Sequence, residues 1–263
     1  MDLGLTGRPA LVAAASKGLG KACAWALAAE GAEVALCARD RATLEATRQE
    51  IADATGTRVE AIPADVATED GAVAFVREGM EALGGCQILV ANAGGPPSGQ
   101  ALGFSDQEIR SALDLNFLST VRMVREAVPR MRDAGYGRVV VISSSSIKQP
   151  VAGLVLSTSA RAAAAGWTRH LADELAPEGI TVNTVLPGRI ETDRVRSLRR
   201  ETADRDGVDV DEVASREAAA IPAGRIGDPA ELGALVAFLC SQQASYVTGG
   251  FISVDGGAYR GLL

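Results

Sequence analysis

The sequence predicts an α/β protein: a doubly wound sheet of seven parallel strands with helices on both faces. Short apolar runs alternate with helical patterns from one end of the chain to the other. Several of these runs contain no polar residue, as expected for parallel strands that are covered on both sides. The strand-to-helix alternation repeats six times, which is the pattern of a doubly wound fold.

The elements follow from the periodicity of each segment. The predicted strands are Pro9–Ala14, Glu33–Ala38, Arg58–Ile62, Gln87–Ala91, Arg138–Ser143, Thr181–Leu186 and Gly250–Val254. The predicted helices are Leu19–Ala29, Ala42–Thr55, Glu69–Leu83, Asp106–Asp133, Val155–Leu175 and Pro229–Ser241. Because no linker-like stretch or internal repeat divides the chain, residues 1–263 are expected to form a single domain.

One segment departs from the alternation. Asp193–Gly227 is polar and rich in arginine, and it falls between the sixth and seventh predicted strands. Two short helices there would form a substrate lid over the carboxyl ends of the strands, whereas the alternative is a solvent-facing insertion. Its place in the chain order favours the lid.

Composition narrows the class of function. Hydrophobic residues make up 47% of the 263 residues and charged residues 22%, as in a globular protein. The net charge of -7 argues against nucleic-acid binding. Four scattered cysteines and one histidine, His170, indicate reduced core thiols and no metal site. Met1–Leu11 lacks a signal-peptide pattern and no apolar run is long enough to span a membrane, so we expect a cytoplasmic protein.

A glycine loop follows the first strand. It reads Ala13-Ala14-Ala15-Ser16-Lys17-Gly18-Leu19-Gly20 and leads directly into a helix. Gly18 and Gly20 allow close backbone approach, and the helix start directs its unpaired N–H groups toward a pyrophosphate. A glycine pair alone is weak evidence for a dinucleotide site, but the ends of the next three strands support it.

Arg39 ends the second strand, where the fold meets the adenosine ribose. An acidic residue there would bind the 2′-hydroxyl, whereas arginine favours a 2′-phosphate, which Lys17 also reaches. Asp65 and Val66 follow the third strand, beside the expected adenine, and the small residues of Asn92-Ala93-Gly94 end the fourth. The sequence therefore predicts NADP(H) as the preferred cofactor, with NAD(H) as the alternative.

The chain at this point strongly resembles the short-chain dehydrogenase/reductase family, in particular its β-ketoacyl-carrier-protein-reductase-like branch. The resemblance covers nearly the whole length. The motifs that carry it are Ala14-x-x-x-Gly18-x-Gly20, Asn92-Ala93-Gly94, Asn116, Ser143–Ser146, Pro187-Gly188, Tyr246-Val247-Thr248-Gly249-Gly250 and Val254-Asp255-Gly256-Gly257. The family usually has Thr-Gly where this chain has Ala13-Ala14, which reduces the room in the loop slightly.

The resemblance implies a Rossmann fold and assigns the cofactor site. Together with the residues above, the cofactor-binding set is Ala14, Ser16, Lys17, Gly18, Leu19, Gly20, Arg39, Asp65, Val66, Asn92, Ala93, Gly94, Arg161, Pro187, Gly188, Ile190 and Thr192. Ile190 and Thr192 would contact the nicotinamide and its carboxamide. The resemblance also implies a homo-oligomer, a dimer or tetramer, with the helices Asp106–Asp133 and Val155–Leu175 as the shared faces.

Family members move hydride between nicotinamide and a carbonyl or alcohol, with Asn, Ser and a Tyr-x-x-x-Lys pair as catalytic groups. A phenol with a pKa of ~10 becomes more acidic beside an ammonium one helical turn away. Asn116 and Ser144 match the first two groups, although the serines beside Ser144 leave that assignment open by one residue.

The catalytic tyrosine and lysine are replaced. Ser157 stands at the tyrosine position and Arg161 at the lysine position, and the motifs downstream secure this register. The pair still lies one turn apart on one helix face. Arginine can bind a ribose hydroxyl or an anion, but an alkyl hydroxyl is far less acidic than a phenol and cannot simply inherit its role.

Three hypotheses follow. The first is a reductase acting on a small-molecule carbonyl or alcohol whose acid has moved, with Lys148 as the best candidate because burial or a nearby Arg161 would lower its pKa. The second is an NADP(H)-binding protein without redox chemistry, a sensor or an inactive subunit. The third is a non-redox enzyme that uses Arg161 to clamp an anion. The retained charge of Arg161, together with Asn116 and Ser144, favours the first.

Overall fold

A computed structural model describes residues 2–262 of the chain. Its centre is a sheet of seven strands that are all parallel, in the order β3-β2-β1-β4-β5-β6-β7. The strands are β1 (Pro9–Val12), β2 (Glu33–Ala38), β3 (Val59–Pro63), β4 (Ile88–Ala91), β5 (Gly137–Ile142), β6 (Ile180–Pro187) and β7 (Phe251–Val254). The predicted fold class is therefore confirmed.

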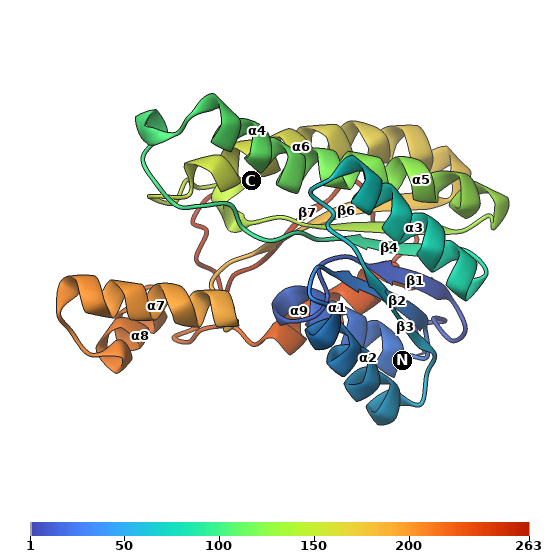
Figure 1. The fold of residues 1–263 in the computed structure, drawn as a ribbon, viewed down its shortest axis with the longest axis horizontal. Coiled ribbons are helices and arrows are strands. Elements are labelled where there is room, and N and C mark those ends of the chain that lie inside the picture. The colour runs from blue at the N-terminus through green and yellow to red at the C-terminus, as the bar shows by residue number, and fades with distance from the viewer. Residues whose placement is uncertain (1, 263) are drawn as a thin grey trace.

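Helices cover both faces of the sheet (Figure 1). One layer contains α1 (Gly18–Ala29), α2 (Arg41–Thr55) and α9 (Pro229–Cys240). The other contains α3 (Glu69–Leu83), α4 (Asp106–Leu113), α5 (Ser119–Asp133) and α6 (Val155–Leu175). No helix among residues 2–262 is both long and apolar enough to cross a membrane.

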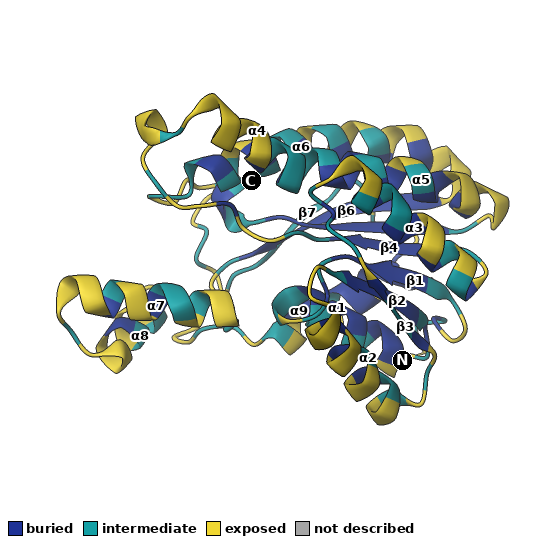
Figure 2. Ribbon diagram, in the orientation of Figure 1, coloured by how far each residue is buried: buried dark blue, intermediate teal, exposed yellow. Residues whose placement is uncertain are grey.

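The core lies in two layers, one on each side of the strands. Along β1, Ala10 and Val12 face the cluster beneath α1 and α9, whereas Leu11 and the following Ala13 face the cluster beneath α3 and α5. Because successive side chains of a strand point to opposite faces, a strand buried on both sides is largely apolar along its whole length. Figure 2 shows the strands as the buried centre of the molecule.

The predicted helix Asp106–Asp133 is interrupted. Residues Asp114–Leu118 form a π-helical turn between α4 and α5, and Asn116 lies buried within it, 4% exposed. A π-turn widens the helix by one residue and so changes the direction in which a side chain points. Neither glycine nor proline marks this turn, so the sequence carried no signal for it.

The segment between β6 and α9 contains two helices, α7 (Asp193–Asp206) and α8 (Val210–Ala219), which project from the body of the molecule (Figure 1). Arg199, only 9% exposed, joins them. Its Nε donates to Glu217 of α8 at 3.0 Å and its Nη2 to Glu191 at 2.8 Å, while Arg189 pairs with Glu217 at 3.0 Å. This ion-pair network ties both helices to the end of β6.

The contact between α1 and α9 requires a glycine. A Cβ built on Gly233 would lie 2.5 Å from the carbonyl oxygen of Ala22, a backbone atom that cannot rotate away. We predict that Gly233→Ala lowers the free energy of unfolding by about 1–3 kcal/mol because the helices must separate, despite alanine's higher helix propensity. Urea denaturation measures this effect.

Gly85→Ala is the matched control. A Cβ at Gly85 would contact only a Pro9 carbon, at an ordinary 3.8 Å. Its unfolding free energy should stay within about 0.5 kcal/mol of the original protein. Equal stability of the G233A and G85A proteins would show that α1 and α9 pack less tightly than this structure has them.

Candidate active site

Most of the predicted site residues lie on loops at the carboxyl ends of the strands, whereas Asn116 lies in the π-turn and Ser157 and Arg161 lie on α6. Parallel strands bring these ends to one edge of the sheet, and β1 pairs with both β2 and β4 at the point where the strand order reverses. Ligands of open α/β sheets bind in the crevice at this point. A dinucleotide is therefore expected to bind at the loops after β1 and β4.

The glycine loop approaches its neighbours closely. A Cβ on Gly20 would lie 2.3 Å from the carbonyl oxygen of Ala14 and 2.9 Å from Nδ2 of Asn92, so only glycine fits there. Asn92 in turn donates to the carbonyl oxygens of Ala13 at 3.2 Å and Ala14 at 3.3 Å. The end of β4 thus holds the loop in place at the start of α1.

Ala14 has a left-handed backbone, with φ of 48°. It is the sole non-glycine residue with positive φ among residues 2–262. Alanine pays a steric penalty in this region because its Cβ crowds the backbone. Alanine in place of the family's usual glycine therefore strains the backbone of the loop at residue 14. This strain outweighs the slight loss of room that the sequence predicts.

Two cations stand at the predicted ribose end. Arg39 is exposed and forms no ion pair within the described chain. The pKa of Asp40 is lowered by hydrogen bonds from Thr43, and further by the charge of Lys17. The charge of Lys17 also helps to lower the pKa of Asp193, after a hydrogen bond from Arg196. Lys17 therefore lies between the turn after β2 and the start of α7.

The loop after β3 is held by its own backbone. Oδ1 of Asp65 accepts from the N–H of Ala67 at 3.1 Å, and the Asp65 carbonyl accepts from the hydroxyl of Thr68. Val66 is buried, with 6% exposure. This fixes the carboxylate and the apolar residue side by side at the edge of the crevice.

Arg161 is the centre of the predicted catalytic cluster. Its Nε donates to Oγ of Ser157 at 3.2 Å, and its Nη1 donates to the carbonyl oxygen of Ile142 at 2.8 Å. Longer contacts join Nη2 to the carbonyl oxygens of Ala93 at 3.4 Å and Gly94 at 3.5 Å. Burial lowers the pKa of the guanidinium to about 10. The side chain thus bridges α6 to the ends of β4 and β5.

Asn116 joins the same network. Its Nδ2 donates to the carbonyl oxygen of Gly94 at 2.9 Å, the oxygen that Arg161 also approaches. Its Oδ1 is buried without a hydrogen-bond partner. A buried acceptor without a donor is uncommon and points to a ligand or water that completes the site.

The serine run after β5 is divided by burial. Ser143 and Ser146 are buried and their hydroxyls lack partners, whereas Ser144 is partly exposed. Oγ of Ser144 accepts from the N–H of Ser146 at 3.1 Å. Ser144 is therefore better placed than its buried neighbours to meet a substrate.

Lys148 takes no part in the hydrogen bonds of this cluster within the described residues. Its Nζ is 5.1 Å from the centroid of the Tyr259 ring, in the segment after β7. It makes no hydrogen bond with Ser144 or Ser157 within the described residues. The contact of Lys148 with an aromatic face is a cation–π interaction.

The residues after β6 close the crevice. The N–H of Gly188 donates to Val254 at 2.9 Å, Ile190 is buried, and Thr192 caps α7 by accepting from Val195 at 3.3 Å. A Cβ at Gly18 would lie 3.6 Å from Cγ2 of Thr192. The glycine loop and the start of α7 therefore lie next to each other.

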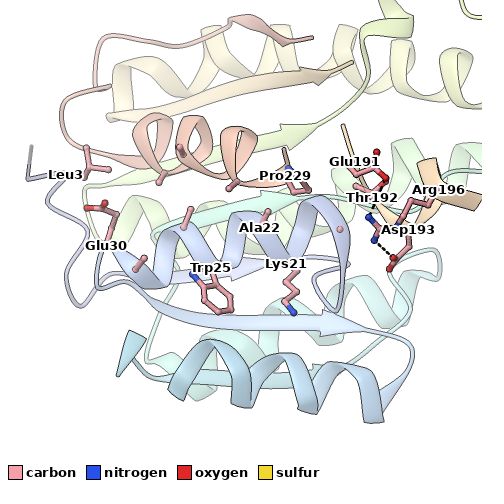
Figure 3. A pocket seen from close by; sticks show the side chains of 16 residues that line it. Leu3, Lys21, Ala22, Trp25, Glu30, Glu191, Thr192, Asp193, Arg196 and Pro229 are labelled. Carbon is pink, nitrogen blue, oxygen red and sulfur yellow. Dashed lines mark hydrogen bonds and ion pairs between the residues drawn. The ribbon is translucent and has the colours of Figure 1, made fainter. Parts of the chain in front are cut away.

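A groove of about 720 Å³ starts at this point and runs along the outside of α1 and α9. Figure 3 shows the side chains that line it. Six alanines of α1 and α9 line it, with Trp25 and Lys21 on one side and Arg196 at the α7 end. Gly18 and Thr192 are its sole lining residues that belong to the predicted site. The groove is thus beside the cofactor loop and separate from Ser157 and Arg161.

The backbone carbonyls that hold Arg161 were not foreseen from the sequence. Ile142, Ala93 and Gly94 act through main-chain oxygens, which every residue possesses. No side-chain signal marks such positions.

The fold and site together define a dinucleotide-binding oxidoreductase of the Rossmann type. Residues 13–259 match the family model described as enoyl-(acyl carrier protein) reductase. The chain belongs to the short-chain dehydrogenase/reductase family.

Relatives and solved structures of this family align over almost the whole chain. The chain is 34% identical to the 3-oxoacyl-[acyl-carrier-protein] reductase FabG of Vibrio cholerae, covering 98% of this chain and 99% of the relative. It is 38% identical to the short-chain reductase protein NovJ of Streptomyces niveus, with 94% of this chain and 92% of the relative covered. L-sorbose reductase from Gluconobacter frateurii, solved with NADPH and L-sorbose, superposes with a TM-score of 0.96 at 32% identity, covering 100% of both chains.

The strained alanine gives a direct test of the loop. Ala14→Gly removes the Cβ at φ of 48°. We predict an increase in the free energy of unfolding of about 1 kcal/mol, because relief of the left-handed strain exceeds the added freedom of the unfolded chain. Thermal and urea denaturation measure it. An A14G protein that is less stable than the original would contradict the left-handed conformation.

Proposed function

We propose that this protein is an NADP(H)-dependent oxidoreductase that interconverts a carbonyl and an alcohol with a non-standard proton donor. The observation that carries the proposal is the network in which Arg161 and Asn116 share the Gly94 carbonyl beside the glycine loop. It joins the predicted catalytic residues to the end of β4, where the cofactor would pass.

The residues present fit a dinucleotide. Gly20 has no room for a side chain, Asn116 offers an unpartnered buried acceptor, and Arg39 is a cation without an ion pair in the described chain. The start of α1 would hold the pyrophosphate, Lys17 and Arg39 the 2′-phosphate, and Ile190 and Thr192 the nicotinamide end. When bound, NADP(H) supplies or accepts the hydride.

The chain's own residues would position the substrate. Ser144 and Ser157 present hydroxyls from the end of β5 and from α6, and the substrate oxygen would lie between them. Arg161 would bind the nicotinamide ribose and keep Ser157 oriented. The relatives support a small-molecule carbonyl as the substrate class, since they are reductases of 3-oxoacyl groups and of L-sorbose.

Helices α7 and α8 would act as a lid that moves as one unit, because Arg199 and Glu217 join them. A homo-oligomer, a dimer or tetramer, would use α5 and α6 as its shared faces.

The replacement of both Tyr and Lys also favours a second function, NADP(H) binding without redox chemistry. Turnover distinguishes the two. A protein that binds NADPH and oxidises it in the presence of acetoacetyl-CoA, L-sorbose or an activated aryl ketone is a reductase, whereas binding without oxidation by any of a broad set of carbonyls is the signature of a sensor.

Cofactor preference tests the role of Arg39. We predict that Arg39→Ala weakens NADPH binding by about tenfold to hundredfold, the effect of losing one charge-assisted hydrogen bond. The dissociation constant of NADH should stay nearly unchanged, because NADH lacks the 2′-phosphate. Titration by nicotinamide fluorescence gives both constants.

Arg58→Ala is the matched control. Arg58 is exposed, pairs with Glu60 and directly precedes β3, so it lies at the amino ends of the strands, away from the predicted cofactor site. It should leave both constants unchanged. Equal losses of NADPH and NADH affinity in R39A would refute a 2′-phosphate contact, and no binding of either cofactor to the original protein would refute the proposed function.

A further inference from the structure

Arg161 is a cation whose hydrogen-bond acceptors are all neutral. Its nitrogens donate to Ser157 and to the carbonyl oxygens of Ile142, Ala93 and Gly94, and no carboxylate within residues 2–262 pairs with it. Without a counter-charge, desolvation disfavours the protonated form. This arginine is therefore a stronger acid than an ordinary one, with its pKa lowered to about 10.

The hydroxyl of Ser157 is oriented by this contact. A hydroxyl has one proton and two lone pairs, and Nε–H of Arg161 occupies one lone pair at 3.2 Å. Ser157 is partly exposed and donates to no other described residue. Its proton is thus available to a substrate oxygen, and the adjacent positive charge strengthens the donation.

On the basis of the proposed carbonyl–alcohol chemistry, we infer that Arg161 and Ser157 form a two-step proton relay to the substrate oxygen. When the carbonyl carbon gains a hydride, the C=O π pair moves to oxygen and forms a bond with the Ser157 proton. The Oγ–H bond of Ser157 breaks as Oγ takes the Nε proton of Arg161. Arg161 is left as a neutral guanidine and regains its proton from water.

The direction of transfer is favourable. An alcohol has a pKa close to that of water, about 16, so serine alone could not supply a proton at neutral pH. A guanidinium with a pKa of about 10 can, because the proton moves to the more basic alkoxide. After the transfer, Nη1 still donates to the carbonyl of Ile142 and Nη2 to those of Ala93 and Gly94, so the neutral side chain keeps its place.

The relay differs from a displaced acid at Lys148. The ammonium of Lys148 lies over the ring of Tyr259 and makes no hydrogen bond to Ser157 in the described chain. Arg161, by contrast, contacts Ser157 directly. The two donors therefore give opposite expectations for variants at positions 148 and 157.

Substitutions separate these donors. With acetoacetyl-CoA or L-sorbose as probe, Ser157→Ala should lower kcat about 100-fold to 10,000-fold, the usual worth of general acid catalysis, while Ser157→Thr keeps the hydroxyl and stays within about tenfold. K148A should retain turnover within about threefold, as should R169A, a control on the same helix whose arginine is exposed and ion-paired with Asp173. NADPH dissociation constants of all four should match the original protein.

A readout without turnover tests the contact itself. The Nε–H resonance of Arg161 in a nitrogen-labelled sample should be shifted and protected from exchange, and S157A should remove both effects while S157T keeps them. The relay is overturned if S157A retains full kcat or if K148A alone abolishes turnover. It is also overturned if the shift and exchange protection of the Arg161 Nε–H resonance are the same in S157A as in the original protein. Failure of the original protein to bind NADPH would instead refute the proposed function.

The pH dependence of the two reaction directions gives a separate prediction. Reduction needs protonated Arg161, which persists below its pKa of about 10, so kcat for reduction should be flat from pH 7 to about 9. Alcohol oxidation needs the neutral form, whose population rises about tenfold per pH unit below the pKa. Oxidation with NADP⁺ should therefore rise about hundredfold between pH 7 and 9.

The S157A protein is the control for this profile, since without the hydroxyl Arg161 cannot reach the substrate and the slope should disappear. An oxidation rate that is level from pH 7 to 9 in the original protein would overturn the relay.

Discussion

Every functional contact of this molecule depends on seven parallel strands that end at one edge. Because all the strands run in one direction, the loops that follow them lie together at the carboxyl edge of the sheet, where ligands of open α/β sheets bind. Because β1 pairs with both β2 and β4, the loops after these strands open on opposite sides of one crevice. Asn92 holds the loop after β1 by a hydrogen bond to Ala13. The loop then lies so close to Gly20 that no side chain fits at that position.

The same edge supplies the acceptors for Arg161. The carbonyls that end β4 and β5 cannot all be satisfied within the sheet, and a guanidinium offers five donors in a fixed plane. A lysine ammonium at this position would present a compact charge, whereas arginine spans from Ser157 on α6 to Ile142 on β5. The replacement of lysine by arginine therefore preserves the charge and adds a directed contact with residue 157.

The sheet and most helices could be predicted because apolar runs and capping residues are local signals. Asp40, Thr68 and Asp228 cap the helices α2, α3 and α9 as such residues usually do. The π-turn around Asn116 and the left-handed Ala14 could not, since the first depends on tertiary packing and the second on a backbone angle that alanine rarely adopts. For the site, the sequence singled out Asn116, Ser157 and Arg161, which one hydrogen-bond network joins in the structure, and also Lys148, which makes no hydrogen bond to that network in the described chain. It did not predict the main-chain carbonyls that arrange them.

The two replacements in the catalytic pair are physically linked. A serine extends less far from α6 than a tyrosine, so a substrate oxygen must approach the helix more closely to reach it. In the proposed relay Arg161 would compensate for this, because its Nε donates to Oγ of Ser157 from one turn further along the same helix. Tyrosine with lysine relies on the acidity of a phenol, whereas in the proposed relay serine with arginine would rely on a desolvated cation. With serine at position 157 but lysine at position 161, a weakly acidic hydroxyl would lack the directed contact from the cation. With tyrosine at position 157 and arginine at position 161, the guanidinium would be crowded against a phenol. The two positions are therefore best understood as a single unit.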